Sequence, residues 1–184
     1  MRAMETGIKA KLDYDDYAGI PPDRNRYEII DGELYVTPAP SPLHQRVSKR
    51  LFRVLEDYFE APGRGEVFFA PIDLILTRHD VVQPDLVVVT DPAAISQRGI
   101  ERPPALVVEV LSPSSASQDR HVKARRYATL GIPHYWIVDP EGRWIECFRA
   151  DGDRYALVVR GEGDARLAHP DWPGLVVGLA AVWR

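Results

Sequence analysis

The chain has 184 residues, of which 45% are hydrophobic and 27% charged, a composition typical of a globular protein. Its net charge of −4 argues against a protein that coats nucleic acid through bulk positive charge, although it leaves room for a local basic patch. The single cysteine, Cys147, excludes an internal disulfide framework. The longest apolar run, near Gly174–Trp183, is far shorter than the roughly 20 residues that span a bilayer. The first residues hold no apolar stretch of signal-peptide length, so we expect a cytoplasmic protein that does not bind membranes.

The first sixty residues predict a short helix, a hairpin and a long helix. The sequence LDYDDYAGIPP (12–22) is typical of a short helix that ends at a glycine before two prolines. RYEIIDGELYV (26–36) predicts two strands joined by a tight turn at Asp31-Gly32. From 41 to 60, apolar residues recur at helical spacing after a Ser-Pro start, which predicts a long amphipathic helix.

The rest of the chain alternates strand and helix patterns. Strands are predicted at EVFFA (66–70), IDLIL (72–76), PDLVVV (84–89), ALVVEVL (105–111), HYWIVD (134–139), RWIECFRA (143–150) and RYALVVR (154–160). A helix from about Ser117 to Leu130 ends at Gly131. Strands before and after this helix predict a βαβ unit, hence an α/β (α+β) fold with a mixed central sheet flanked by helices. The pattern assigns no element to residues 174–184.

Two carboxylates stand in otherwise apolar strands. Asp85 follows a proline at the start of one strand, and Glu109 stands near the end of another. A carboxylate in such a frame is costly unless it is paired or coordinated. If the two strands are antiparallel neighbours, both carboxylates converge on one point. That arrangement suits Mg²⁺, which takes one or two carboxylates and keeps several waters, and the backbone carbonyl of Val110 is a possible third ligand.

Each carboxylate also has a simpler interpretation. Asp85 could begin its strand without further role, and Glu109 could pair with an arginine at the sheet edge. For a single carboxylate this interpretation has the better odds, but two in similar frames favour a site. Asp73 is a third candidate, and alternation along its strand leaves its face undetermined.

Helical spacing indicates which side chains of the predicted 117–130 helix face the sheet. Lys123, Tyr127 and Leu130 share one face of the predicted helix, whereas Arg125 and Arg126 lie off that stripe and are expected to meet solvent. Lys123 follows the Glu109 strand closely in the sequence, so its ammonium could approach the point on which Asp85 and Glu109 converge. The alternative is a lysine whose stem covers apolar surface while its ammonium reaches solvent.

Other candidates are weaker. His44 could reach the site from the start of the long helix, or it could serve as a cap or lie at the surface. Glu28 and Glu33 flank the hairpin turn, and one of them could join the metal site while the other is solvated. The sequence contains no Gly-x-Ser-x-Gly frame, no P-loop and no Cys/His zinc spacing. The histidines at 79, 121, 134 and 169 show no ligand spacing.

These motifs, in this order, resemble the Uma-two family of putative restriction endonucleases, within the PD-(D/E)XK nuclease superfamily. The resemblance covers roughly Leu12 to Pro140 and is carried by RYEIIDGELYV, SPLHQRVSKRL, VVQPDLVVV, LVVEVLSPSS, Lys123, Tyr127 and GIPHYWIVDP. It implies one restriction-endonuclease-like domain over 1–184, with an N-terminal β-hairpin. It also implies hydrolysis of DNA with Mg²⁺, for which Mn²⁺ would substitute.

The resemblance also implies roles for single residues. Asp85 and Glu109 would be the two acidic positions of the superfamily motif. The superfamily lysine would stand two residues after Glu109, where this chain has Leu111, and within its own family the lysine corresponds to Lys123 on the following helix. His44 or Glu33 would carry protons or act as an outer-shell ligand.

Two other classes stay open from the sequence. A nucleic-acid-binding or regulatory module that kept the fold and lost cleavage is favoured by Leu111 and by the acidic net charge. A structural protein would pair its carboxylates with arginines. For a nuclease we expect a homodimer, because cleavage of a duplex needs two sites and symmetric pairs are the commonest oligomers.

Overall fold

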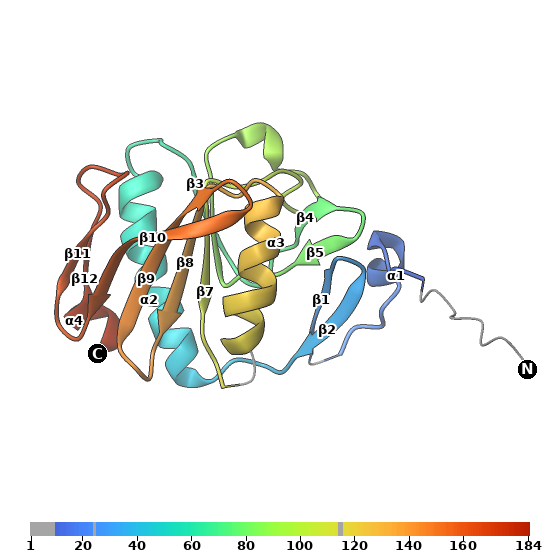
Figure 1. Ribbon diagram of the computed structural model, residues 1–184, viewed down its shortest axis with the longest axis horizontal. Helices are drawn as coiled ribbons and strands as arrows, with labels where there is room; N and C mark the ends of the chain where they lie inside the picture. The colour runs from blue at the N-terminus through green and yellow to red at the C-terminus, as the bar shows by residue number, and fades with distance from the viewer. Residues whose placement is uncertain (1–9, 24, 114–115) are drawn as a thin grey trace, which may run out of the picture.

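The computed structural model describes residues 10–23, 25–113 and 116–184, which form three β-sheets and several helices (Figure 1). Within these residues the largest sheet has six strands in the order β10-β9-β8-β7-β6-β3. Its strands are β3 (Glu66–Phe69), β6 (Leu86–Val89), β7 (Leu106–Val110), β8 (His134–Asp139), β9 (Trp144–Asp151) and β10 (Arg154–Glu162). The second sheet, in the order β2-β1-β5-β4, consists of β1 (Arg26–Ile30), β2 (Glu33–Thr37), β4 (Leu74–Thr77) and β5 (Asp80–Val82). A small third sheet pairs β11 (Arg166–Ala168) with β12 (Val176–Gly178).

The helices are α1 (Tyr14–Ala18), α2 (Pro42–Phe59), the 3₁₀ turn η1 (Pro92–Ala94), the π-helix η2 (Gln118–Lys123), α3 (Ala124–Thr129) and α4 (Leu179–Trp183). Three helical regions lie close to where the sequence predicts them, namely α1, α2 and the stretch formed by η2 and α3, whereas the sequence does not predict η1 and α4. The α2 helix starts at Pro42, and the Ser41 hydroxyl caps it by accepting a bond from the His44 N–H. The predicted hairpin is confirmed as β1 and β2, with Asp31 and Gly32 in the left-handed conformation that its two-residue turn requires.

The pairing of three neighbouring strands in the large sheet matters most for function. Strands β7 and β8 are parallel and are joined through η2 and α3, so the predicted βαβ unit is confirmed. Strands β6 and β7 are antiparallel, with Leu86 opposite Val108. This register continues one residue further to Asp85 and Glu109, which therefore lie at the same edge of the sheet.

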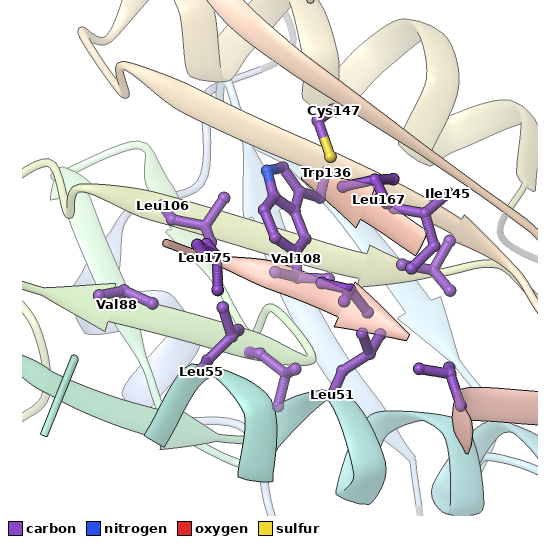
Figure 2. Close-up of a cluster of buried hydrophobic side chains, with 14 of the residues drawn as sticks. Leu51, Leu55, Val88, Leu106, Val108, Trp136, Ile145, Cys147, Leu167 and Leu175 are labelled. Atoms are coloured by element: carbon purple, nitrogen blue, oxygen red, sulfur yellow. The ribbon is translucent and has the colours of Figure 1, made fainter. Parts of the chain in front are cut away.

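Helix α2 and the C-terminal elements cover one face of the large sheet. Leu51 and Leu55 of α2 pack under Val88, Val108 and Trp136 (Figure 2). Elements β11, β12 and α4 join this same cluster, so the residues 174–184 that the sequence pattern could not assign form a strand and a helix that complete the core.

The other face of the large sheet packs against α3 and the hairpin sheet. Tyr127 of α3 and Ile30 of β1 belong to one cluster with Val107, Leu111 and Ile137. Residues 107, 109 and 111 alternate with those that face α2, so Glu109 lies on the α3 side of β7. Arg125 is exposed as expected, whereas Arg126 is only partly exposed, because it donates two hydrogen bonds to the buried carboxylate of Asp80.

No helix within residues 10–23, 25–113 and 116–184 is both long enough and apolar enough to cross a bilayer.

The packing of α2 predicts a large cost for truncating its central leucine. Leu51 is fully buried, so Leu51→Ala should lower the free energy of unfolding by about 2–5 kcal/mol, because less apolar surface is buried and a cavity is left behind. Chemical denaturation measures this change. The matched control, Leu34→Ala on the exposed side of the hairpin, should change it by no more than about 0.5 kcal/mol. Equal losses in the two variants would contradict this account of the core.

Candidate functional site

A cleft lies where β6 begins and β7 ends. Its cavity volume is about 220 Å³, and its lining includes Asp85, Glu109 and Lys123. Asp85 is 4% exposed and Glu109 is 2% exposed, so both carboxylates are withdrawn from solvent. We call this feature the carboxylate cleft. The prediction that Asp85 and Glu109 converge is confirmed by the strand register, while their chemical roles stay predictions.

Asp85 is held from three sides. Its Oδ2 accepts a hydrogen bond from the Val110 backbone N–H at 2.8 Å and lies 3.0 Å from His44 Nε2. Its Oδ1 accepts a bond from Arg26 at 3.1 Å. Burial by itself would raise the pKa of Asp85, but the contacts with His44 and Arg26 outweigh burial and hold this pKa below its usual value. Asp85 is therefore ionised at neutral pH.

Glu109 is in the opposite electrostatic situation. Its Oε1 accepts bonds from the Lys123 ammonium and the Tyr127 hydroxyl, both at 3.0 Å. Burial raises the pKa of Glu109 well above its usual value, and the charges of neighbouring carboxylates add to this effect, although Lys123 opposes it. The carboxylate of Glu109 is thus destabilised by the lack of solvent and by surrounding negative charge.

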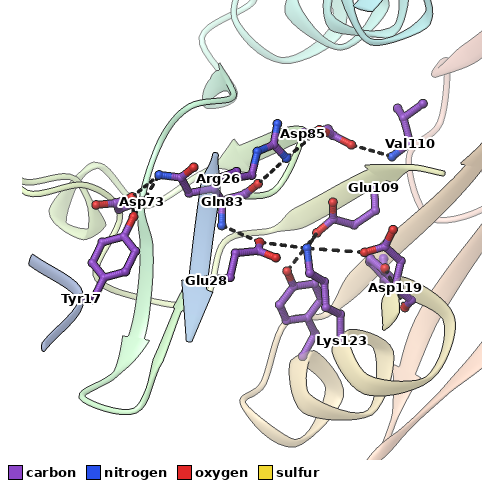
Figure 3. Close-up of polar contacts among 12 residues, drawn as sticks. Tyr17, Arg26, Glu28, Asp73, Gln83, Asp85, Glu109, Val110, Asp119 and Lys123 are labelled. Carbon is purple, nitrogen blue, oxygen red and sulfur yellow. Dashed lines mark hydrogen bonds and ion pairs between the residues drawn. The ribbon is translucent and has the colours of Figure 1, made fainter. Parts of the chain in front are cut away.

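The Lys123 ammonium connects three elements of the fold. It donates to Glu28 Oε1 at 2.9 Å and to Glu109 Oε1 at 3.0 Å, and it lies 3.5 Å from Asp119 Oδ1 (Figure 3). Burial favours the neutral amine, but Glu109 and Glu28 more than compensate and raise the pKa of Lys123 well above its usual value. The alternative in which the ammonium reaches solvent is therefore wrong, because Lys123 is buried and charged.

The π-helix η2 presents Asp119 and Lys123 to the cleft. These residues lie four positions apart on η2, and Tyr127 follows on α3. Both Asp119 and Lys123 are buried, whereas the neighbouring His121 and Val122 are exposed. Short π-helical turns are rare and frequently occur at functional sites, where they re-aim side chains.

The accessory candidates separate into two groups. His44 reaches Asp85, and Glu28 reaches Lys123, so both belong to the cleft. Glu33 is exposed and accepts a bond from Tyr35, and it is not among the residues that line the cleft. Asp73 points away toward Tyr17, accepting bonds from the Tyr17 hydroxyl at 2.7 Å and the Gln83 amide at 2.9 Å (Figure 3). Of the two hairpin glutamates, the structure thus brings only Glu28 to the cleft.

Sequence reasoning missed two residues that line the cleft, Arg26 and Asp119, and one hydrogen bond, that of Tyr127. Arg26 stands two residues before Glu28 on β1, so strand alternation puts both on one face, and this signal could have found Arg26. Asp119 stands four residues before Lys123 and offered a comparable signal. Tyr127 was placed on the correct stripe, but its hydrogen bond to Glu109 depends on tertiary packing that spacing does not reveal.

The charges of the cleft do not balance. Its lining holds more buried carboxylates than cations: Glu28, Asp85, Glu109 and Asp119 face Arg26 and Lys123. When all four are ionised, these carboxylates carry two more charges than Arg26 and Lys123 together, and His44 lies against one of them, Asp85. Oxygen donors with excess negative charge match the preferences of a hard divalent cation.

A second groove adjoins the cleft along α2. Its cavity volume is about 480 Å³, and Arg26, His44 and Asp85 line both cavities, so the two are continuous. We call it the α2 groove. Its lining includes the exposed basic residues Arg46, Lys49 and Arg53 and the exposed ring of Phe69, which is 62% accessible. The molecule thus has a local basic surface beside the carboxylates despite its acidic net charge.

The mixed sheet with helices on its faces is that of a restriction-endonuclease-like fold, and the two carboxylates lie where β6 begins and β7 ends. The crystal structure of a putative nuclease belonging to DUF820 from Anabaena variabilis matches this chain with a TM-score of 0.76, over 94% of this chain and 97% of the other, at 17% identity. At that identity the likeness establishes the shared fold. The family model described as Uma2, putative restriction endonuclease, matches residues 13–181. The chain belongs to the Uma2 family.

Two uncharacterized proteins of Synechocystis sp. (strain PCC 6803) are similar in sequence. One is 28% identical over 146 residues, which is 78% of this chain and 76% of the relative. The other is 29% identical over 143 residues, which is 74% of this chain and 79% of the relative.

The raised pKa of Glu109 predicts a stabilising substitution. Because the folded chain binds the Glu109 proton more tightly than the unfolded chain does, ionised Glu109 destabilises the ion-free fold above this pKa, by about 1.4 kcal/mol for each pH unit by which the pKa is raised. Glu109→Gln should therefore raise the free energy of unfolding at pH 8 in chelator. The gain should shrink as the pH falls toward the usual glutamate value.

Denaturation at several pH values measures this gain, with Glu33→Gln as the matched control. Glu33 is exposed, so its variant should match the wild type throughout. A Glu109→Gln protein less stable than the wild type at pH 8 would mean that the Lys123–Glu109 ion pair outweighs the cost of burying the carboxylate.

Proposed function

We propose that this protein is an Mg²⁺-dependent endonuclease that hydrolyses phosphodiester bonds of DNA in the carboxylate cleft. The observation that carries the proposal is the pair of buried carboxylates, Asp85 and Glu109, which the antiparallel register of β6 and β7 brings to one cleft. Membership of a family of restriction endonucleases supports the nuclease class. The proposal includes action as a pair of copies, since a duplex has two strands to cut.

Asp85 and Glu109 are the residues that would hold the metal, with the Val110 carbonyl as a further ligand. Asp85 is kept ionised by Arg26 and His44, and a cation would relieve the electrostatic cost of ionised Glu109. When bound, Mg²⁺ lowers the pKa of a coordinated water and offsets the negative charge that builds up on the scissile phosphate.

Lys123 would act on the nucleophile and the phosphate. An ammonium offers three N–H donors, and Glu28 and Glu109 engage it within 3.0 Å. Glu28 fixes the ammonium from the hairpin side, so its positive charge is held at the cleft without reorganisation during the reaction. Such preorganised donors stabilise developing negative charge in a site that excludes water.

His44 would move the proton at the leaving oxygen. Its Nε2 lies 3.0 Å from Asp85 Oδ2, and its ring lines both the carboxylate cleft and the α2 groove. A carboxylate partner holds an imidazole in one orientation, which suits a group that passes a proton to a reacting oxygen.

The α2 groove supports a nucleic acid as the substrate. Arg46, Lys49 and Arg53 recur every three to four residues along exposed α2, so their charges follow one line that leads to Asp85. Lysine and arginine contacts to phosphates dominate the affinity of proteins for DNA. The exposed Phe69 ring in the same groove offers a surface on which a base can stack.

The first test compares two aspartates of similar local sequence. Asp85→Asn should lower the rate of Mg²⁺-dependent DNA cleavage by at least about 100-fold, the cost of losing one group that stabilises charge in a transition state. The matched control is Asp73→Asn, whose carboxylate bonds to Tyr17 and Gln83 outside the cleft, and it should cleave at the wild-type rate. Gel assays on supercoiled and linear DNA measure both.

Other results of this experiment have definite meanings. Equal cleavage by Asp85→Asn and wild-type protein would remove the carboxylate cleft from the reaction. A wild-type protein that binds Mg²⁺ in calorimetry and cleaves neither DNA nor RNA would identify the chain as a binding module that retained the fold.

The second test addresses the α2 groove. Reversing two charges in Lys49→Glu/Arg53→Glu should weaken DNA binding in Ca²⁺ and reduce the dependence of log affinity on log salt by about 0.9 for each phosphate that the variant no longer neutralises. Fluorescence anisotropy at several salt concentrations measures both quantities. Arg166→Glu, on exposed β11, is the control and should bind as the wild type does. An unchanged salt dependence in the double variant would exclude α2 from the path of the DNA.

A further inference from the structure

A second group of ligand-type side chains lies at the other end of β8 and on the other face of the large sheet. His134 begins β8, while His169 and Asp171 follow β11 in the segment that leads to β12. His134 shares a strand face with Trp136, which packs toward α2, whereas Glu109 lies on the α3 side. None of these three residues is part of the described lining of the carboxylate cleft. In Figure 1 the β11–β12 sheet and the β1–β2 hairpin stand on opposite sides of the molecule.

The three side chains present ligand atoms to one another without bonding directly. One ligand atom from each of His134, His169 and Asp171 lies within 4.8 Å of the other two. The Nδ1 of His134 is 3.8 Å from Asp171 Oδ2, which is too long for a hydrogen bond. Among the described residues, His134 Nδ1, His169 Nε2 and Asp171 Oδ2 are buried and have no hydrogen-bond partner. Buried polar atoms left this way are costly, so the arrangement calls for a bound species between them.

The surrounding residues fix the orientation of these three groups. Arg149 donates to Asp171 Oδ1 at 2.7 Å and leaves Oδ2 turned toward His134. The His169 ring stacks on Trp172 with a centroid distance of 4.3 Å and an angle of 29°. Partners that orient ligands in this way are a regular feature of metal sites.

We propose that His134, His169 and Asp171 bind one borderline transition-metal ion, with Zn²⁺ as the representative, and thereby tie the segment 169–172 to strand β8. Two imidazoles and one carboxylate form a three-ligand set that Zn²⁺ accepts with water in its fourth position. Imidazole nitrogen suits Zn²⁺, Ni²⁺ and Cu²⁺, whereas Mg²⁺ prefers oxygen. The two ends of the molecule therefore select different metals.

Both imidazoles are available as neutral ligands at pH 7. Burial lowers the pKa of His134, and burial together with His134 lowers the pKa of His169 to about 4. Metal binding at neutral pH thus displaces no proton from either ring. The charged groups that face the rings are Asp171, which opposes this lowering, and Arg149, which adds to it.

Binding requires two local adjustments. Tetrahedral bonds of 2.0–2.1 Å put ligand atoms about 3.4 Å apart, whereas these atoms lie within 4.8 Å of one another, so they must draw together by up to about 1.4 Å. The Asp171 backbone N–H donates to His169 Nδ1 at 3.2 Å. When Nε2 of His169 binds the metal, the ring proton lies on Nδ1. A protonated Nδ1 no longer accepts the bond from the Asp171 N–H, so this long hydrogen bond is lost when the metal bond forms.

The test uses Co²⁺ as a spectroscopic probe and Zn²⁺ as the competitor. Chelator-treated protein receives Co²⁺ in the presence of excess Mg²⁺, which competes with Co²⁺ for the oxygen ligands of the carboxylate cleft. We expect one equivalent of Co²⁺ to bind with the intense visible absorption of a tetrahedral site, Zn²⁺ to abolish that absorption, and either ion to raise the melting temperature. These readouts do not depend on cleavage of DNA.

Variants assign the ligands. His169→Gln and Asp171→Asn should each weaken Co²⁺ binding by at least about 100-fold, because loss of an outer-shell partner alone costs 10- to 100-fold. Their melting in chelator verifies that they are folded. The matched control is His121→Gln, which removes an exposed histidine and should bind Co²⁺ as the wild type does. Wild-type protein that binds Co²⁺ no better than folded His169→Gln would overturn the proposal and leave an ordered water as the bound species.

Discussion

The buried ammonium of Lys123 is the interaction on which the site depends. It bonds to Glu28 from the hairpin sheet and Glu109 from the large sheet, and it lies beside Asp119 of η2. Without this cation, carboxylates from three elements would meet in a space with little solvent, and such an assembly would not stay closed. The same ammonium is the group that we assign to the chemistry. Stability of the cleft wall and charge stabilisation during cleavage thus rest on one atom.

The two ends of the large sheet bury different kinds of polar group. In the carboxylate cleft, buried carboxylates outnumber the cations that face them, and the proposed Mg²⁺ would restore the balance. At the start of β8, neutral imidazoles face one carboxylate whose other oxygen is bound by Arg149. Because donor type selects the metal, the two proposed sites would take different ions and would not compete for one.

Much of the cleft could be predicted because its members sit in regular elements. Apolar frames around Asp85 and Glu109 identified them, and helical spacing placed Lys123 and Tyr127 together. The choice between Glu28 and Glu33 could not be made, since a hairpin pattern does not say which face of it meets the large sheet. The face of Asp73 could not be predicted either. It lies just outside β4 and bonds to Tyr17, away from the cleft. His134, His169 and Asp171 come together only through the docking of the β11–β12 segment, which leaves no periodic signal.

Leu111 lies on the same face as Glu109 and belongs to the core that packs against α3. The position that would bring a lysine to the cleft on β7 itself is therefore filled with apolar packing, and the ammonium arrives on η2. A lysine on β7 would move with Glu109, because both would share one strand. Here the cation and the carboxylate belong to different elements, so their 3.0 Å contact depends on how η2 packs against β7. Because Lys123 opposes the rise in the pKa of Glu109, a substitution that moves η2 changes the charge state of Glu109 without touching the strand that carries it.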